Sequence, residues 1–235
     1  HESILRELEE DPTIIVRLQE AKAADQLPPS YTEHCIVAAN PDEEVLPMSL
    51  YMDGLPYSQT DWVVGLWLIN MISGMRHMVA VIRKRICCKC GCRAFCTFHA
   101  LYRFIHWSLT ALADKMHPQL RHDSQPWQER DAHRALVAGQ PTRLRAALCQ
   151  IKGDWSEFCS RFGFPNWQSN MRPCFLCNAS PDLLWSIRGV SPISLPWCLN
   201  DPAAYLTAVE RCEITVVINA DQYSRLRALL KYDKR

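Results

Sequence analysis

"LPMSLYMDGLPYSQTDWVVGLWLINMISGMRHMVAVIR", residues 46–83, is the stretch of sequence that decides the fold. It holds three apolar runs, which are separated by Gly54-Leu55-Pro56 and by Ser73-Gly74. Runs rich in valine, isoleucine, leucine and tryptophan are typical of strands, and the second gap has the length of a hairpin turn. We therefore predict three adjacent antiparallel strands, at 46–53, 62–72 and 75–83.

The chain after this meander alternates between helix-like and strand-like patterns. Apolar residues repeat at intervals of three and four in 99–116, which predicts a helix. Residues 144–151 have the pattern of a buried strand and 155–162 that of a helix, and a last strand at 214–218 precedes a last helix. The order β-β-β-α-β-α, continued by β-α, predicts an α/β fold with a mixed sheet.

The N-terminal part differs in composition from this core. A helix is predicted after Asp11, with Asp11 as N-cap, Pro12 in the first turn and Pro28-Pro29 as its end. Residues 27–46 are polar and rich in proline, as in a linker. We expect an acidic helix and linker at 1–44 and the core at 45–235, and the start at His1 suggests a piece of a longer protein.

Charge is unevenly distributed along the chain. Residues 1–61 contain 3 basic and 13 acidic residues, whereas the remainder contains 23 basic and 12 acidic ones. No acidic residue occurs between Trp62 and Ala113. Such asymmetry fits either a surface that faces a polyanion, shielded by the acidic segment, or an ordinary solvated face. The most apolar window, 62–75, is too short for a membrane span of about 20 residues.

Cysteine is the strongest compositional signal, because 12 are present and five lie within "CCKCGCRAFC", 87–96. Disulfides between such close neighbours are strained, whereas thiolates that converge on one metal ion suit the crowding. We predict a structural Zn²⁺ site in an insertion at 86–98, with free thiols or disulfides as alternatives. The predicted ligands are Cys88, Cys90, Cys92 and Cys96. Cys87 is an additional cysteine that four-coordination does not require, and His99 could replace one of the thiolates.

A second cysteine pair lies in the segment 170–180. Cys174 and Cys177 have the spacing of half a zinc site, and Cys159, Cys198 or the earlier cluster would have to complete it. The even number of cysteines and the sequon at Asn178 keep a secreted, disulfide-bonded protein as an alternative.

Two aspartates follow strand-like runs, and each allows two interpretations. Asp53-Gly54 is a common turn sequence, and Asp154 is a suitable N-cap for the helix after it. If the strands before them are parallel neighbours, both carboxylates lie at one edge of the sheet, where a shared cation would offset their repulsion. Mg²⁺ or Mn²⁺, which prefer oxygen ligands, are the expected ions, and such sites serve phosphodiester chemistry.

The segment "LYMDGLPYSQTDWVVGLWLINMISGMRHMVAVIRKR", followed by "QIKGDWSEFCSRFGF" and "RPCFLCNAS", resembles the catalytic core of DDE/D-type transposases of eukaryotic transposable elements. The resemblance covers about residues 46–180 and implies a ribonuclease-H-like fold. It also implies that Asp53 is the first catalytic carboxylate and Asp154 the second. A third acid is not evident in the matching segment, and the candidates are Asp221, the weaker Glu210 and Glu213, or a residue beyond Arg235.

The resemblance implies a metal-dependent enzyme that cleaves DNA phosphodiester bonds or transfers DNA strands. Its expected partner is DNA, its expected location is the nucleus, no membrane is involved and a homo-oligomer is possible. The main alternative is a domesticated or decayed relative, which would keep the zinc-stabilised fold as a non-catalytic module that binds DNA or protein.

Overall fold

The computed structural model describes residues 1–56, 58–59, 61–90, 94–161, 168 and 203. The chain divides into two compact units, residues 1–163 and 164–235, and the elements below belong to the first. The predicted last strand and helix and the three candidates for the third acid lie outside the described residues.

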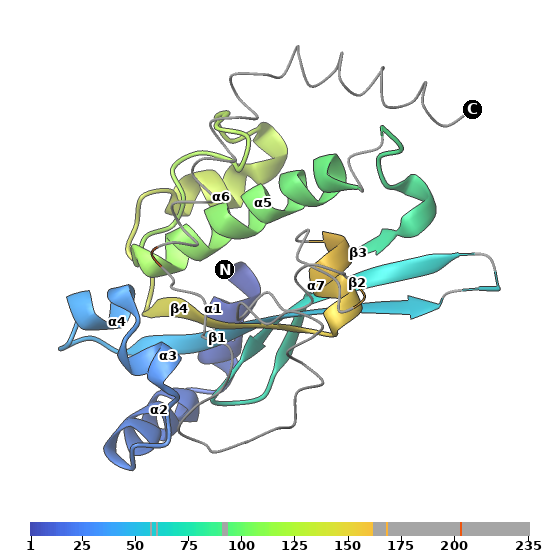
Figure 1. The fold of residues 1–235 in the computed structure, drawn as a ribbon. Coiled ribbons are helices and arrows are strands. Elements are labelled where there is room, and N and C mark those ends of the chain that lie inside the picture. Colours follow the sequence, from blue (N-terminus) through green and yellow to red (C-terminus); the bar gives the residue numbers. More distant parts are fainter. Residues whose placement is uncertain (57, 60, 91–93, 162–167, 169–202, 204–235) are drawn as a thin grey trace, which may run out of the picture. The chain divides into compact units, whose positions relative to one another are not determined.

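A four-stranded mixed sheet forms the centre of this unit (Figure 1). The strands lie in the order β3-β2-β1-β4; β1 pairs antiparallel with β2, β2 antiparallel with β3, and β1 parallel with β4. The predicted meander and the mixed α/β sheet are therefore confirmed. The strands are β1 (Val45–Pro56), β2 (Trp62–Asn70), β3 (Arg76–Arg83) and β4 (Arg145–Gly153).

Strand β1 is longer than predicted. It continues to Pro56, which is paired with Trp62, so Asp53 lies inside the strand, opposite Gly65 of β2. The prediction that Asp53 ends the strand is therefore wrong. Backbone hydrogen bonding to β2 outweighs the turn preference of Asp-Gly at this position, and the chain turns only after Pro56.

Helix α5 (Phe95–Ala113) covers one face of the sheet (Figure 1). Its Phe98, Ile105 and Leu112, which repeat every seven residues, join the main hydrophobic cluster with even-numbered residues of β1 such as Met48 and Met52. The helix begins four residues before the predicted start, directly after Ala94, which has a left-handed φ of 69°. Met116, predicted as helical, follows the helix.

The N-terminal segment forms four short helices. Ile4 and Leu8 belong to the same hydrophobic cluster as the sheet, so this segment packs on the core. The stretch expected as a linker is partly helical, and the buried Tyr31 in it donates a hydrogen bond to the Val45 carbonyl at 2.9 Å. The helices are α1 (Glu2–Glu10), α2 (Thr13–Ala23), α3 (Pro29–Thr32) and α4 (Cys35–Ala39); α1 is not predicted from the sequence.

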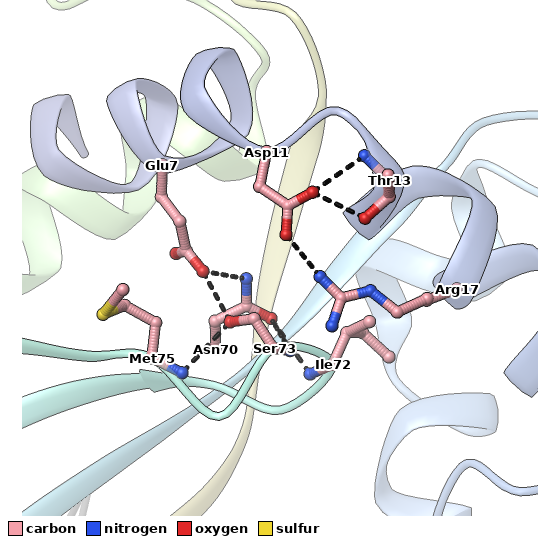
Figure 2. A network of polar contacts seen from close by, with 8 residues as sticks. All are labelled: Glu7, Asp11, Thr13, Arg17, Asn70, Ile72, Ser73 and Met75. Carbon is pink, nitrogen blue, oxygen red and sulfur yellow. Dashed lines mark hydrogen bonds and ion pairs between the residues drawn. The ribbon is translucent and has the colours of Figure 1, made fainter.

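A buried polar network ties α1 to the turn between β2 and β3 (Figure 2). The Glu7 carboxylate accepts hydrogen bonds from Asn70 Nδ2 at 3.1 Å and Ser73 Oγ at 2.5 Å. His77 Nε2 lies 2.6 Å from the other oxygen of Glu7. A buried carboxylate is stable only when its oxygens have such partners, so the network fixes α1 on the hairpin.

Shorter elements complete the unit. The 3-10 helix η1 (Lys84–Ile86) leads from β3 into the cysteine-rich segment, and η2 (Glu129–Asp131) runs into α6 (Ala132–Val137). Helix α7 (Trp155–Arg161) begins where the sequence predicts it. Among the described residues, no helix has the length and apolar character that a membrane crossing requires.

Candidate functional site

The strand pairing brings the two predicted aspartates to the same edge of the sheet. Strands β1 and β4 are parallel neighbours, which is the condition for a shared site, and their last pair is Met52 with Gly153. Asp53 is the next residue of β1, and Asp154 directly follows the last residue of β4. The two residues therefore occupy neighbouring backbone positions, where β4 ends and β1 continues beside β2.

The side chain of Asp53 is held by a neighbour on its own strand. Tyr51 Oη donates a hydrogen bond to Asp53 Oδ2 at 3.0 Å. Residues two apart in a strand project to the same face, so phenol and carboxylate share one face of β1. The pKa of Tyr51 is raised mainly by this hydrogen bond, with smaller contributions from burial and from the charges of Asp53 and Asp154. Both carboxylates are thus within electrostatic range of one phenol.

Asp154 also caps helix α7, the alternative role that the sequence allows. Its Oδ1 accepts hydrogen bonds from the Glu157 backbone N–H at 2.8 Å and from Ser156 Oγ at 2.9 Å. These bonds fix the carboxylate at the helix N-terminus, where the helix dipole favours negative charge. Capping uses one oxygen and is compatible with a cation at the other.

Glu157 is a third carboxylate at this end of the sheet that the sequence analysis does not identify. It is only 6% exposed, and a Cβ added at Gly54 would lie 2.5 Å from its Oε1. Gly54 follows Asp53 directly, so its missing side chain would project to the opposite face of β1, and Glu157 packs on that face. Glu157 lies three residues after the capping Asp154, which is the spacing of a capping box. This spacing is the sequence signal from which the position of Glu157 at the start of α7 could have been predicted.

The chemistry of the two aspartates fits Mg²⁺ or Mn²⁺. These ions prefer carboxylate oxygens, and Mg²⁺ commonly binds one or two protein carboxylates together with water and substrate phosphate. Asp154 is exposed and Asp53 is half-buried, so solvent and a substrate have access. The described part of the chain adds no third carboxylate within ligand distance of this pair, since its one group of three candidate metal ligands is formed by cysteines.

Three of the four predicted zinc ligands lie together where the segment after η1 meets the first turn of α5. The Sγ atoms of Cys88, Cys90 and Cys96 all lie within 4.8 Å of one another, and those of Cys90 and Cys96 are 3.8 Å apart. Two sulfurs bound at about 2.3 Å to one tetrahedral Zn²⁺ would be separated by about 3.8 Å. Cys92, Cys174 and Cys177 lie outside the described residues.

Local hydrogen bonds support thiolate ligands in this cluster. The Cys90 backbone N–H donates to Cys88 Sγ at 3.4 Å, and the Cys88 backbone N–H donates to Thr97 Oγ1 at 2.9 Å. Cys96 lies in the first turn of α5, a 19-residue helix whose positive dipole end lowers the cost of a negative sulfur. The arrangement is suited to a structural metal ion held by sulfur ligands.

Acidic residues of the segment 1–61 form ion pairs with basic residues of the segment 62–235. Glu43 lies 2.8 Å from Lys115 Nζ and 3.3 Å from Arg145 Nε, and these contacts, Lys115 first, hold the pKa of Glu43 below its ordinary value. Asp61 forms a similar pair with Arg83 at 2.8 Å. The charge asymmetry of the sequence is therefore in part balanced within the chain.

One sizeable cavity lies apart from the two aspartates. It has a volume of about 800 Å³ and lies between the outer face of α5 and residues 116–124. Trp107, His106 and His122 are among its lining residues. No residue of β1 or β4 lines it, so it adds nothing to the carboxylate site.

Comparison with models of protein families, with curated proteins and with solved structures gave no match for this chain.

Proposed function

We propose that this chain is a transposase-derived core of the DDE/D type, which cleaves or transfers DNA phosphodiester bonds with a divalent metal ion. The observation that carries the proposal is the parallel pairing of β1 and β4, which ends at Met52 and Gly153. This pairing supports a site shared by Asp53 and Asp154, which directly follow that last pair although they are about a hundred residues apart in the sequence. A three-stranded meander followed by a helix and a parallel fourth strand supports a ribonuclease-H-like core as the finer description of the fold.

The residues at this edge have distinct roles in the proposed site. A bound Mg²⁺ or Mn²⁺ would polarise the phosphodiester and activate the attacking water or hydroxyl. Asp53 would hold the ion through a carboxylate whose orientation Tyr51 fixes by its hydrogen bond at 3.0 Å. Asp154 provides the second carboxylate, held in place by its bonds to α7. We further propose DNA as the partner, the nucleus as the location and Zn²⁺ as the structural ion of the cysteine cluster.

The test is nicking of an end-labelled DNA duplex by the purified chain in the presence of Mn²⁺. We expect nicking by the wild-type chain and its loss in Asp53→Asn and in Asp154→Asn, because each substitution removes a carboxylate ligand. Asp25→Asn is the matched control: it makes the same chemical change in the turn after α2, where φ is 52° and asparagine is tolerated. Nicking that survives both substitutions, or that Asp25→Asn also abolishes, would contradict the proposal.

The second candidate is a non-catalytic, zinc-stabilised module that binds DNA or protein. It is favoured by the compact Cys88, Cys90 and Cys96 cluster and because no three carboxylates among the described residues lie within metal-ligand distance of one another. This candidate predicts no nicking under any metal condition, together with DNA retention that weakens steeply as the salt concentration rises. A secreted, disulfide-bonded protein would instead contain no zinc.

A further inference from the structure

The face of the sheet that carries Asp53 differs from the face covered by α5. Side chains alternate along a strand, so Tyr51, Asp53 and Leu55 share the face opposite to that of Met52. The register places Trp67 opposite Tyr51, and Gly65 opposite Asp53, on strand β2. This face therefore carries an aromatic pair in the row next to the proposed catalytic carboxylate.

Helices cover only one end of this face within the described residues. The small hydrophobic cluster there consists of Leu18, Tyr31, Val45 and Ala147, at the start of β1 and β4. Further along, Met78, opposite Trp67, is 65% exposed, and Val81, opposite Gly65, is 49% exposed. Apolar side chains thus face solvent beside the aspartate site.

The aromatic pair lies close to the row of Asp53. The ring centroids of Tyr51 and Trp67 are 5.7 Å apart, with 37° between the ring planes. A Cβ added at Gly65 would lie 2.0 Å from Cη2 of Trp67, so the indole ring lies over Gly65, the residue paired with Asp53. Glycine at position 65 makes room for the ring, and the indole forms a flat surface beside the carboxylate.

Basic side chains border this surface on both sides. Lys152 of β4 is opposite Tyr51 in the register and is exposed. Arg76 at the start of β3 is also exposed, and the register places it opposite Ile69, two residues along β2 from Trp67. A flat aromatic surface between two cations suits a ligand that combines a planar base with phosphates.

We propose that Tyr51 and Trp67 form a stacking platform for an unpaired nucleotide of the DNA strand whose phosphodiester bond reaches Asp53. This inference rests on the proposed function and adds the kind of substrate, a single strand or a frayed end. An unpaired base exposes its flat face to an aromatic ring, whereas a paired base inside a duplex does not. Stacking is insensitive to sequence, because every base has such a face.

The experiment measures binding of the whole 235-residue chain to fluorescein-labelled oligodeoxythymidine by anisotropy, in EDTA so that no cleavage occurs. Trp67→Ala removes the indole, and Trp67→Leu keeps an apolar side chain over Gly65 while it removes the aromatic plane. We expect both variants to bind the single strand roughly 5- to 100-fold more weakly than the wild type. A blunt duplex of the same length should bind more weakly than the single strand to the wild-type chain.

Trp62→Ala is the matched control. Trp62 is another tryptophan of β2, 49% exposed, but it lies an odd number of residues from Trp67 and so projects to the other face. We expect its binding to stay within about twofold of the wild type. Three results would overturn the inference. Trp67→Leu could bind as tightly as the wild type, or Trp62→Ala could lose as much binding as Trp67→Leu. The wild-type chain could also fail to bind the single strand, as when another part of the chain covers the platform. Nicking is measured in a separate experiment. If Trp67→Leu binds the single strand weakly and the wild-type chain does not nick DNA, the stacking platform is supported and the proposed enzymatic function is rejected.

Discussion

The carboxylate edge and the cysteine cluster are both candidate metal sites, but the fold builds them in different ways. Asp53 lies in β1 and Asp154 directly follows β4, and these two strands are paired in parallel. Cys88 and Cys90 lie in a segment between η1 and α5, and Cys96 lies in the first turn of that helix. The proposed oxygen ligands thus lie on or next to paired strands, whereas two of the three sulfur ligands lie in a segment without helix or strand.

The two kinds of site are expected to differ in how much a bound ion contributes to the stability of the fold. An ion on a rigid scaffold contributes little to folding and remains available to a substrate. An ion that joins a loop to a helix contributes its binding free energy to the folded state. The stability of the protein should therefore respond strongly to changes at the cysteines and weakly to changes at the aspartates.

The largest effect is expected from loss of the cysteine-bound metal. Metal analysis of the purified chain should detect zinc, and Cys90→Ser should reduce its content. Because a structural zinc contributes folding free energy, we expect the variant, or chelation of the wild type, to lower the free energy of unfolding by several kcal/mol. Thermal unfolding followed by circular dichroism, with and without chelator, is the measurement.

Cys35→Ser is the control for this experiment. Cys35 is exposed in α4, outside the cluster, and its substitution should change neither the zinc content nor the melting temperature. If the purified chain contains no zinc and a chelator leaves its melting temperature unchanged, the cysteine cluster does not hold a structural metal, and the contrast between the two regions fails.

An intermediate effect is expected at Asp154, which has a structural role as well as its proposed functional one. Asp154→Ala removes the cap of α7 and should lower the free energy of unfolding by about 1 kcal/mol. Asp154→Asn keeps an oxygen acceptor for the Glu157 N–H and should cost less than Asp154→Ala, although both remove the proposed ligand. Urea unfolding of the two variants gives the comparison. Equal destabilisation by both would show that the negative charge, not the cap, stabilises this end of the sheet.

Much of this architecture could be predicted from the sequence, because its signals are local or periodic. Strand-like runs with Gly and Pro between them predict the meander, and the close spacing of cysteines predicts the meeting of Cys88, Cys90 and Cys96. The sequence allows β4 to lie parallel beside β1, because a strand after a crossover helix can take that place, but it does not determine this order.

The remaining features depend on register and packing, which no local pattern contains. The sequence does not predict helix α1, because its few apolar residues, Ile4, Leu5 and Leu8, lie among charges that are typical of a solvated segment. The burial of Glu7 depends on partners more than 60 residues away in sequence. Likewise, only the register of β1 and β2 shows that Trp67 lies beside Tyr51.

The smallest effect on stability is expected for Asp53→Asn, the substitution that should abolish nicking. Asparagine retains an oxygen that can accept the hydrogen bond of Tyr51, and the backbone pairing with Gly65 does not involve the side chain. We expect the free energy of unfolding to change by less than about 0.5 kcal/mol, as at most sites outside the core. Urea unfolding in EDTA is the measurement, so that no bound ion contributes. A loss of more than about 2 kcal/mol would mean that the Asp53 charge is needed to hold the sheet edge together. Asp53 would then resemble the cysteines as a structural group, and loss of nicking in Asp53→Asn would no longer identify a catalytic carboxylate.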